Sequence, residues 1–165
     1  MEGSLLPLFD LGSITDNAIS MEVLSMNILF WLTPKANVSC IYEDNSVRQG
    51  LEKMRAHRYT AIPVLSKNGE YVGTITEGDF LRHLLEKEKV DLKEEEGCQV
   101  KEILREGFNA PVTITATMEE LLVKVMEQNF VPVVDDRNFF VGIITRKDII
   151  KYFATAQKQE TLTEG

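Results

Sequence analysis

Apolar and polar positions follow the same order twice along this chain. Short runs rich in β-branched and aromatic residues predict strands, and apolar residues three or four apart predict helices between them. In the first half, strands are predicted at 38–42, 61–65 and 71–75, with helices from Val47 and from Glu77. In the second half, strands are predicted at 111–115, 131–135 and 139–144, with helices after Thr117 and from Arg146.

The two halves also share a motif at a fixed spacing. Gly73, Thr76 and Asp79 each have an identical counterpart 69 residues later, at Gly142, Thr145 and Asp148. Repetition at a constant offset indicates one supersecondary unit used more than once. In both halves an apolar-Pro-Val-apolar strand and a short turn come before the motif.

The predicted fold is therefore α+β. Two β-α-β-β-α repeats pack sheet to sheet with pseudo-twofold symmetry, because neither half has enough inward-facing apolar surface alone. An N-terminal helix or arm precedes them, with a helix at 20–32 that ends before Pro34. The domain boundaries that follow are 1–25 for the arm, 26–90 for repeat 1, 91–97 for the linker, 98–156 for repeat 2 and 157–165 for a frayed tail.

Composition narrows the class of protein. A net charge of −8 and a pI near 4.9 argue against a nucleic-acid surface or an anionic membrane surface. The chain shows no apolar run long enough to span a bilayer and no signal-peptide pattern, so a cytoplasmic location is expected. Cys40 and Cys98 are then expected to be free thiols.

Two interpretations of Thr-x-x-Asp stay open on the residues alone. The first is structural: a Thr followed three residues later by an acid resembles a helix capping box. The second is a ligand site, favoured because Asp is shorter than the usual Glu or Gln and because a strand glycine often marks a close approach.

The chemistry of such a site fits a ribonucleotide. A helix N-terminus offers amides to phosphate, and a carboxylate accepts hydrogen bonds from a ribose diol. Arg146 and Lys147 add positive charge beside Asp148, whereas repeat 1 has Glu77 and Gly78 in the equivalent places. The two sites are therefore expected to be unequal.

These motifs resemble the CBS domain, named for cystathionine beta-synthase, whose tandem pair is called a Bateman module. The resemblance covers residues 26–156 and implies an adenine-nucleotide pocket in the cleft between repeats. The main pocket it implies consists of Val38, Ser39, Cys40, Tyr59, Thr60, Ala61, Ile62, Thr145, Arg146, Lys147 and Asp148. The second consists of Thr76, Asp79, Val112, Thr113, Ile114, Phe130 and Val131.

The second pocket departs from the family pattern. The loop before its Pro-Val strand is two residues shorter than in repeat 1. Asn129 and Phe130 also stand where some relatives have a phosphate-binding His-Arg pair. This pocket is therefore expected to bind weakly.

Other chemistry finds little support in the sequence. His57 and His83 are without Cys or acid at metal-ligand spacing, so no metal site is predicted. No phosphate loop, nucleophile elbow or Cys-x-x-Cys is present, and no catalysis is expected.

The function predicted is a non-catalytic regulatory module that binds AMP, ADP, ATP, S-adenosylmethionine or cyclic di-AMP and signals by conformational shift. It needs no cofactor, is expected to form a homodimer, and acts on an unidentified downstream protein. One alternative is an interaction or oligomerisation module with vestigial pockets, and another is a nucleotide hydrolase.

Overall fold

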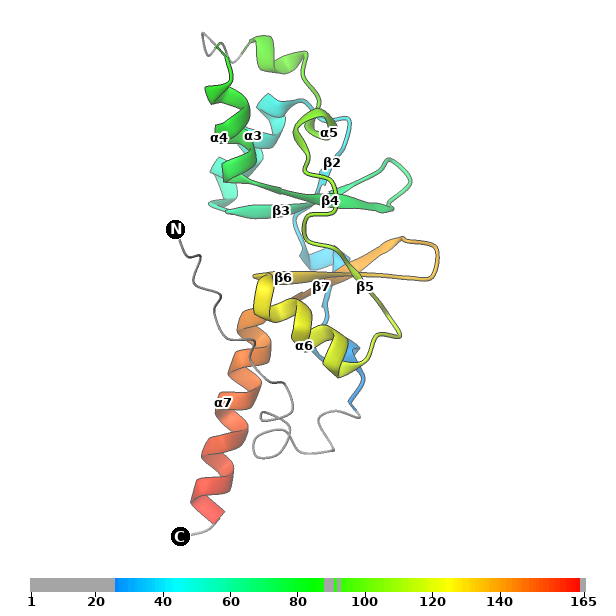
Figure 1. Cartoon of the computed structure of the whole chain (residues 1–165), viewed down its shortest axis with the longest axis vertical. Coiled ribbons are helices and arrows are strands. Elements are labelled where there is room, and N and C mark those ends of the chain that lie inside the picture. Colours follow the sequence, from blue (N-terminus) through cyan, green and yellow to red (C-terminus); the bar gives the residue numbers. More distant parts are fainter. Residues whose placement is uncertain (1–25, 88–90, 92, 164–165) are drawn as a thin grey trace, which may run out of the picture.

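The computed structural model describes residues 26–87, 91 and 93–163. The predicted arm at 1–25 lies outside these residues. The described chain forms two β-α-β-β-α units stacked along the long axis of the molecule, with the sheets facing each other at its centre (Figure 1). The predicted fold class is confirmed. No helix in the described part of the chain is long and apolar enough to cross a membrane.

Repeat 1 contains one three-stranded sheet and two helices. Its elements are β2 (Ile41–Tyr42), α3 (Val47–His57), β3 (Ala61–Leu65), β4 (Tyr71–Thr76) and α4 (Glu77–Leu85). Strand β2 is parallel to β3, and β3 is antiparallel to β4. Ser46 caps α3 through a reciprocal capping box with Gln49.

Repeat 2 has the same order after a short linker. The linker contains the 3-10 turn η3 (Glu94–Glu96). Repeat 2 begins with the short helix α5 (Val100–Ile103) and continues with β5 (Val112–Thr113), α6 (Met118–Glu127), β6 (Phe130–Val134), β7 (Phe140–Thr145) and α7 (Arg146–Thr163). The strand register is also repeated, since Ile62 faces Ile75 in one sheet and Val131 faces Ile144 in the other. Helix α7 continues past Ala156, so fraying of the tail stays a prediction.

The chain entering each repeat first crosses the sheet of the other repeat. Strand β1 (Thr33–Pro34) pairs antiparallel with β7, and the 3-10 turn η2 (Lys35–Asn37) leads from there to β2. A Cβ at Gly142 would lie 2.2 Å from the carbonyl oxygen of Thr33. In repeat 1, a Cβ at Gly73 would lie 2.9 Å from Cδ2 of Leu104, which precedes β5. Both motif glycines are therefore explained by the crossing chain, which removes one argument for a ligand.

These crossings shorten the first strand of each repeat. Strands were predicted at 38–42 and 111–115, but only Ile41–Tyr42 and Val112–Thr113 form ladders. The residues before them span the gap between the sheets and so cannot pair with either neighbour over their full length.

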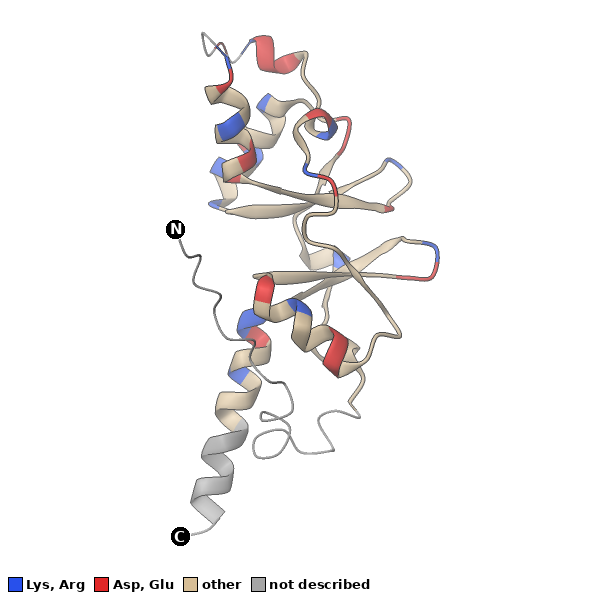
Figure 2. Cartoon of the chain, viewed as in Figure 1, with Lys and Arg blue, Asp and Glu red and all other residues tan. Residues whose placement is uncertain are grey.

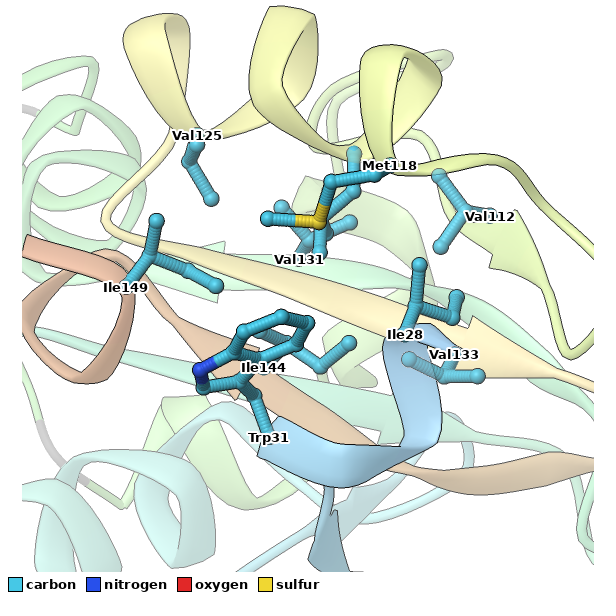
Figure 3. Close-up of a cluster of buried hydrophobic side chains, with 10 residues drawn as sticks. Ile28, Trp31, Val112, Met118, Val125, Val131, Val133, Ile144 and Ile149 are labelled. Atoms are coloured by element: carbon cyan, nitrogen blue, oxygen red, sulfur yellow. The ribbon is translucent and has the colours of Figure 1, made fainter. Parts of the chain in front are cut away.

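Each repeat has its own hydrophobic core between sheet and helices. In repeat 2, side chains from α6, β6, β7 and α7 converge on Ile28 and Trp31 of the 3-10 turn η1 (Ile28–Trp31) (Figure 3). Trp31 is buried, whereas its neighbour Phe30 is 67% exposed. The helix predicted at 20–32 is thus a single turn within the described residues, and positions 20–25 lie outside them.

A third cluster joins the repeats. It contains Leu65 and Tyr71 from one sheet and Val134 and Phe140 from the other. The rings of Tyr71 and Phe140 stack with their centroids 6.1 Å apart. Because these four residues are pairs related by the 69-residue offset, the cluster lies on the pseudo-twofold axis.

We expect Gly142→Ala to destabilise the protein by about 1–3 kcal/mol, because its methyl group would force β1 away from β7. Gly78→Ala is a matched control: the nearest atoms would lie 3.7 Å away, in ordinary contact, and Ala favours helix. Urea unfolding followed by circular dichroism measures both. Equal stability of the Gly142→Ala variant and the wild type would contradict the crossing-chain explanation.

Candidate functional site

Both Thr-x-x-Asp motifs cap the N-terminus of a helix. Asp79 accepts a hydrogen bond from the Thr76 amide at 2.8 Å, and its own amide donates to Thr76 Oγ1 at 3.3 Å. In repeat 2, the Asp148 amide donates to Thr145 Oγ1 at 3.1 Å, and the Thr145 hydroxyl donates to Asp148 Oδ2 at 2.5 Å. The structural interpretation is therefore correct: both motifs form helix-capping bonds. What differs between the two copies is the surroundings of the carboxylates.

Asp79 is enclosed by arginines. Its side chain is only 1% exposed, its Oδ1 lies 2.6 Å from Arg105 Nε, and Arg82 of the same helix also pairs with it. Burial alone would raise the pKa of Asp79, but hydrogen bonds from Thr76 and Arg105 outweigh it and hold the pKa below its usual value. In this conformation the carboxylate has no free face for a sugar.

Arg105 reaches Asp79 from the segment that crosses repeat 1. Its guanidinium carbon lies 3.5 Å from the centre of the Phe108 ring, a cation–π contact. Asn109, in the same segment, donates to Thr74 Oγ1 at 3.0 Å and accepts at its carbonyl from the Tyr71 hydroxyl. These buried bonds fix the segment, and with it Arg105, against the end of β4.

The other residues predicted for the second pocket have mixed positions. Val112 and Val131 point into the core of repeat 2, so only their backbone could face a ligand. Thr113 is exposed, and Ile114 and Phe130 are half-buried.

Asp148 is more accessible. It is half-buried, and no ion pair to it occurs among the described residues. Arg146 turns to the side-chain oxygen of Asn129, and Lys147 is exposed. The hydrogen bonds found to Asp148 leave its Oδ1 unengaged at the start of α7. This oxygen and the nearby α7 amides are available to a ligand with hydroxyl and anionic groups.

The first-strand residues predicted for the main pocket lie beside the strand that ends at Thr145. Val38 and Cys40 of repeat 1 pack in the same cluster as Ile143 of β7. Lys53 donates from Nζ to the Cys40 carbonyl. Burial raises the pKa of the Cys40 thiol to about 11, so it is protonated at neutral pH. Cys40 is thus a packing residue, as its place in the sequence suggests.

The remaining main-pocket residues lie just before and at the start of β3, the central strand of the repeat 1 sheet. Tyr59 is 40% exposed and stacks on His57 with ring centroids 5.3 Å apart, whereas Ile62 is buried in the repeat 1 core. Thr60 is exposed, and Ala61 is half-buried. Ser39, between Val38 and Cys40, is also half-buried. No hydrogen bond among the described residues links Tyr59–Ile62 to Thr145–Asp148. That one ligand touches both groups stays a prediction.

Two groups near these helices were not found by sequence reasoning. Arg105 is 26 positions from Asp79, and only the crossing of the chain brings them together. The expectation that His83 is isolated is wrong, because Glu95 and Cys98 lie close to it, with ligand atoms within 4.8 Å of one another. A Glu-x-x-Cys spacing in the linker was the available signal.

Comparison with known proteins agrees with this architecture. The family model described as "CBS domain" matches residues 32–86 and 100–155. The chain belongs to the CBS-domain family. Both CBS-domain matches fall on the two structural repeats described above.

Solved structures with the same fold include proteins crystallised with adenosyl ligands. CbpB in complex with c-di-AMP is 25% identical, with a TM-score of 0.76 over 84% of this chain and 91% of that chain. CBSX2 in complex with AMP is 22% identical, with a TM-score of 0.64 over 81% and 99% of the two chains, and shows the fold alone.

A curated relative is much longer. Homoserine O-acetyltransferase of Methanococcus vannielii is 26% identical over 133 residues, which cover 79% of this chain. The CBS-domain chain spans only 26% of that enzyme. The match thus concerns a part of the enzyme.

We expect Asp79→Asn to lower stability by about 1.5–3 kcal/mol at pH 7, because charged hydrogen bonds to Arg105 and Arg82 are lost. Asp148→Asn, without arginine partners in the described chain, should lower stability by about 1 kcal/mol, the value of a cap.

The stabilisation by Asp79 should also depend on pH. Since the folded pKa of Asp79 is lowered, its contribution to stability is present above the unfolded pKa of about 4 and is lost as pH falls through the folded pKa. Urea unfolding from pH 7 to pH 3 should show the Asp79→Asn deficit narrowing below about pH 4. A deficit independent of pH would contradict the ion-pair assignment.

Proposed function

We propose that this CBS-domain chain is a non-catalytic regulatory module that binds an adenosyl ligand between its two repeats. The observation that supports it most is the half-buried Asp148 at the start of α7, whose Oδ1 makes no hydrogen bond within the described part of the chain. The strand carrying Thr145 is also packed against Val38 and Cys40 of the opposite repeat. A ligand held here would therefore touch both repeats.

The chemistry of the ligand follows from these groups. The Asp148 carboxylate suits a ribose diol, and the exposed Lys147 suits a phosphate. The complexes of CbpB with c-di-AMP and of CBSX2 with AMP make an adenosyl ligand plausible for this chain as well. AMP, ADP and ATP carry both groups, whereas S-adenosylmethionine has the diol without a phosphate and c-di-AMP has phosphates with only a 2′-hydroxyl on each ribose.

The second pocket should bind more weakly or not at all. Any ribose at Asp79 has to displace Arg105, which is held by its ion pair and by its contact with Phe108. The lost ion pair would offset part of the gain from the new contacts. We therefore expect one strong site for each chain.

Signalling would be a shift between two orientations of the repeats. A ligand changes such an equilibrium only by its difference in affinity for the two states. The vestigial-pocket alternative is favoured by the capping bonds at both motifs, which need no ligand. Ligand titration separates the two functions.

Asp148→Ala should lower the affinity for the best adenosyl ligand by about 10- to 100-fold, since hydrogen bonds to a charged group are lost. Asp79→Ala, the matched control at the equivalent position, should leave that affinity nearly unchanged. Isothermal titration calorimetry with the five ligands measures this. At 100 times the Kd, the ligand should also stabilise the wild type by about 2.7 kcal/mol. No binding by the wild type would favour the vestigial-pocket module, and the reverse order of the variants would overturn the ranking of the pockets.

We also propose that the helices form a homodimer surface. Leu81 of α4 and Ile150 of α7 are related by the repeat offset and are 58% and 60% exposed. Met126 of α6 and Leu85 add exposed apolar area. Apolar surface shared by several elements is typical of a contact with another chain.

The double variant Leu81→Glu/Ile150→Glu should be monomeric at a concentration where the wild type is dimeric, because charges on both sides of the contact repel. Val72→Glu, an exposed apolar residue on β4, is the control and should stay dimeric. Light scattering after size exclusion gives the masses. A monomeric wild type at micromolar concentration would overturn this proposal.

A further inference from the structure

A cluster of nitrogen, oxygen and sulfur ligands lies at the end of the molecule opposite the C-terminus of α7. His83 comes from α4, Glu95 from η3, and Cys98 immediately precedes the capping residue of α5. Their ligand atoms all lie within 4.8 Å of one another. Figure 2 shows the acidic η3 turn at this outer end of repeat 1, away from the two sheets at the centre of the molecule. His83 is one helical turn beyond Asp79 on α4, but the cluster is separate from the main nucleotide pocket proposed at Asp148, at the start of α7.

Glu95 is the centre of the cluster. Its side chain is 0% exposed, an unusual position for a carboxylate in a linker. Its Oε2 lies 2.7 Å from His83 Nε2, and Lys87 pairs with Oε1. Hydrogen bonds from these two groups outweigh burial and lower the pKa of Glu95, so the carboxylate is ionised. A buried anion of this kind requires a positive partner.

Cys98 is held in place by its backbone. Its carbonyl accepts from the Val47 amide at 2.8 Å, which ties the linker to the start of α3. Its thiol makes only a long contact of 3.9 Å to the Gln99 carbonyl. The pKa of this thiol is raised by burial and by Glu102 and Glu95, so in the absence of a cation it is protonated.

Histidine nitrogen, cysteine sulfur and carboxylate oxygen are the three donor types that bind Zn²⁺ in proteins. With bonds of about 2.0–2.3 Å, tetrahedral ligand atoms lie roughly 3.3–3.8 Å apart. Ligand atoms up to 4.8 Å apart therefore need to approach by about 1.5 Å at most, while His83 Nε2 and Glu95 Oε2, now 2.7 Å apart, need to separate slightly. Three protein ligands leave the fourth position to water.

We propose that His83, Glu95 and Cys98 form a binding site for Zn²⁺ or a similar divalent transition metal. On binding, the S–H bond of Cys98 breaks and its proton goes to solvent. The metal replaces the hydrogen bond between His83 and Glu95, and the Lys87 ammonium moves out into water. The charge is balanced in both states: one carboxylate with one ammonium before, and a carboxylate and a thiolate with a dication after.

Lys87 is able to make this exchange. Its side chain is 27% exposed and so already reaches solvent, whereas Glu95 has no route to water. The ammonium therefore competes with the metal for the same carboxylate. Other acidic groups, Glu94 and Glu102, lie close enough to act on the charges of the cluster and also favour a cation.

The site would fasten the linker between the repeats. His83 lies on the last helix of repeat 1, and Cys98 begins the path to repeat 2. A metal bound to both fixes the start of the segment that carries Arg105 to Asp79. Metal occupancy would thus influence how repeat 2 is attached without contacting the nucleotide.

Titration of the full chain with Co²⁺ under reducing conditions tests this proposal, because a thiolate ligand gives a near-ultraviolet charge-transfer band. The wild type should show the band, and excess Zn²⁺ should remove it. Cys98→Ser should abolish it, whereas Cys40→Ser, which changes the only other cysteine, should leave it intact. His83→Gln should lower the affinity by at least about 10-fold. Lys87→Met should raise it by up to about fivefold, because a competing charge is removed.

A second measurement does not depend on the variants folding. In the wild type, Zn²⁺ should protect Cys98 but not Cys40 from alkylation, as read by peptide mass spectrometry. No charge-transfer band, a band that persists in Cys98→Ser, or equal alkylation of Cys98 with and without Zn²⁺ would each overturn the site and leave a metal-free ion pair.

Discussion

Two β-hairpins meet at the centre of this molecule, and their pairing determines how the rest is arranged. The Tyr71 amide donates to the Asn138 carbonyl at 2.9 Å, and the Phe140 amide donates to the Gly69 carbonyl at 3.0 Å. Each bond is the counterpart of the other, since Tyr71 corresponds to Phe140 and Gly69 to Asn138 at the 69-residue offset. The stacked rings of Tyr71 and Phe140 are related in the same way. With about 1 kcal/mol for each hydrogen bond, and a similar amount for the ring pair, the contact is strong enough to restrict the relative orientation of the repeats. The paths of the crossing segments follow from that orientation.

The fold was predictable because its signals are local. The β-rich runs of the strands and the three- or four-residue apolar spacing of the helices each depend on a few neighbouring residues, and the same pattern recurs at the 69-residue offset. The crossing of the chain was not predictable in this way. Gly142 indicated that something approaches β7, but its sequence neighbours do not show whether this is a ligand or the Thr33 carbonyl. The answer depends on a pairing between residues more than 100 positions apart, and strand periodicity contains no information on it.

The same limit explains the site. The sequence indicated that the two Asp residues are unequal, from the shorter loop of repeat 2 and from Glu77. The structure adds a different reason, because Arg105 pairs with the Asp79 carboxylate, whereas no ion pair to Asp148 occurs within residues 26–87, 91 and 93–163. Arg105 belongs to a segment without a motif, and its contact with Asp79 exists only because Leu104 packs on Gly73 and Asn109 bonds to Thr74. Motif analysis cannot predict such polar groups, because their position depends on how a distant segment crosses the sheet.

The position of the capping aspartates also suggests how a bound ligand would reach a partner. Asp148 and Ile150 are two residues apart on α7, a rise of about 3 Å, and Asp79 and Leu81 have the same relation on α4. The central hairpin contact resists sliding of the sheets, so the freedom left to the repeats is a small rotation about the axis through that contact. Such a rotation would move the start of α7 relative to Val38 and Cys40 of the opposite repeat. A ligand that draws α7 toward Val38 and Cys40 would therefore displace Ile150 directly, while Leu81 stays fixed by the Asp79–Arg105 pair. One half of the proposed dimer surface would move relative to the other, which is the type of change that an associated chain can detect.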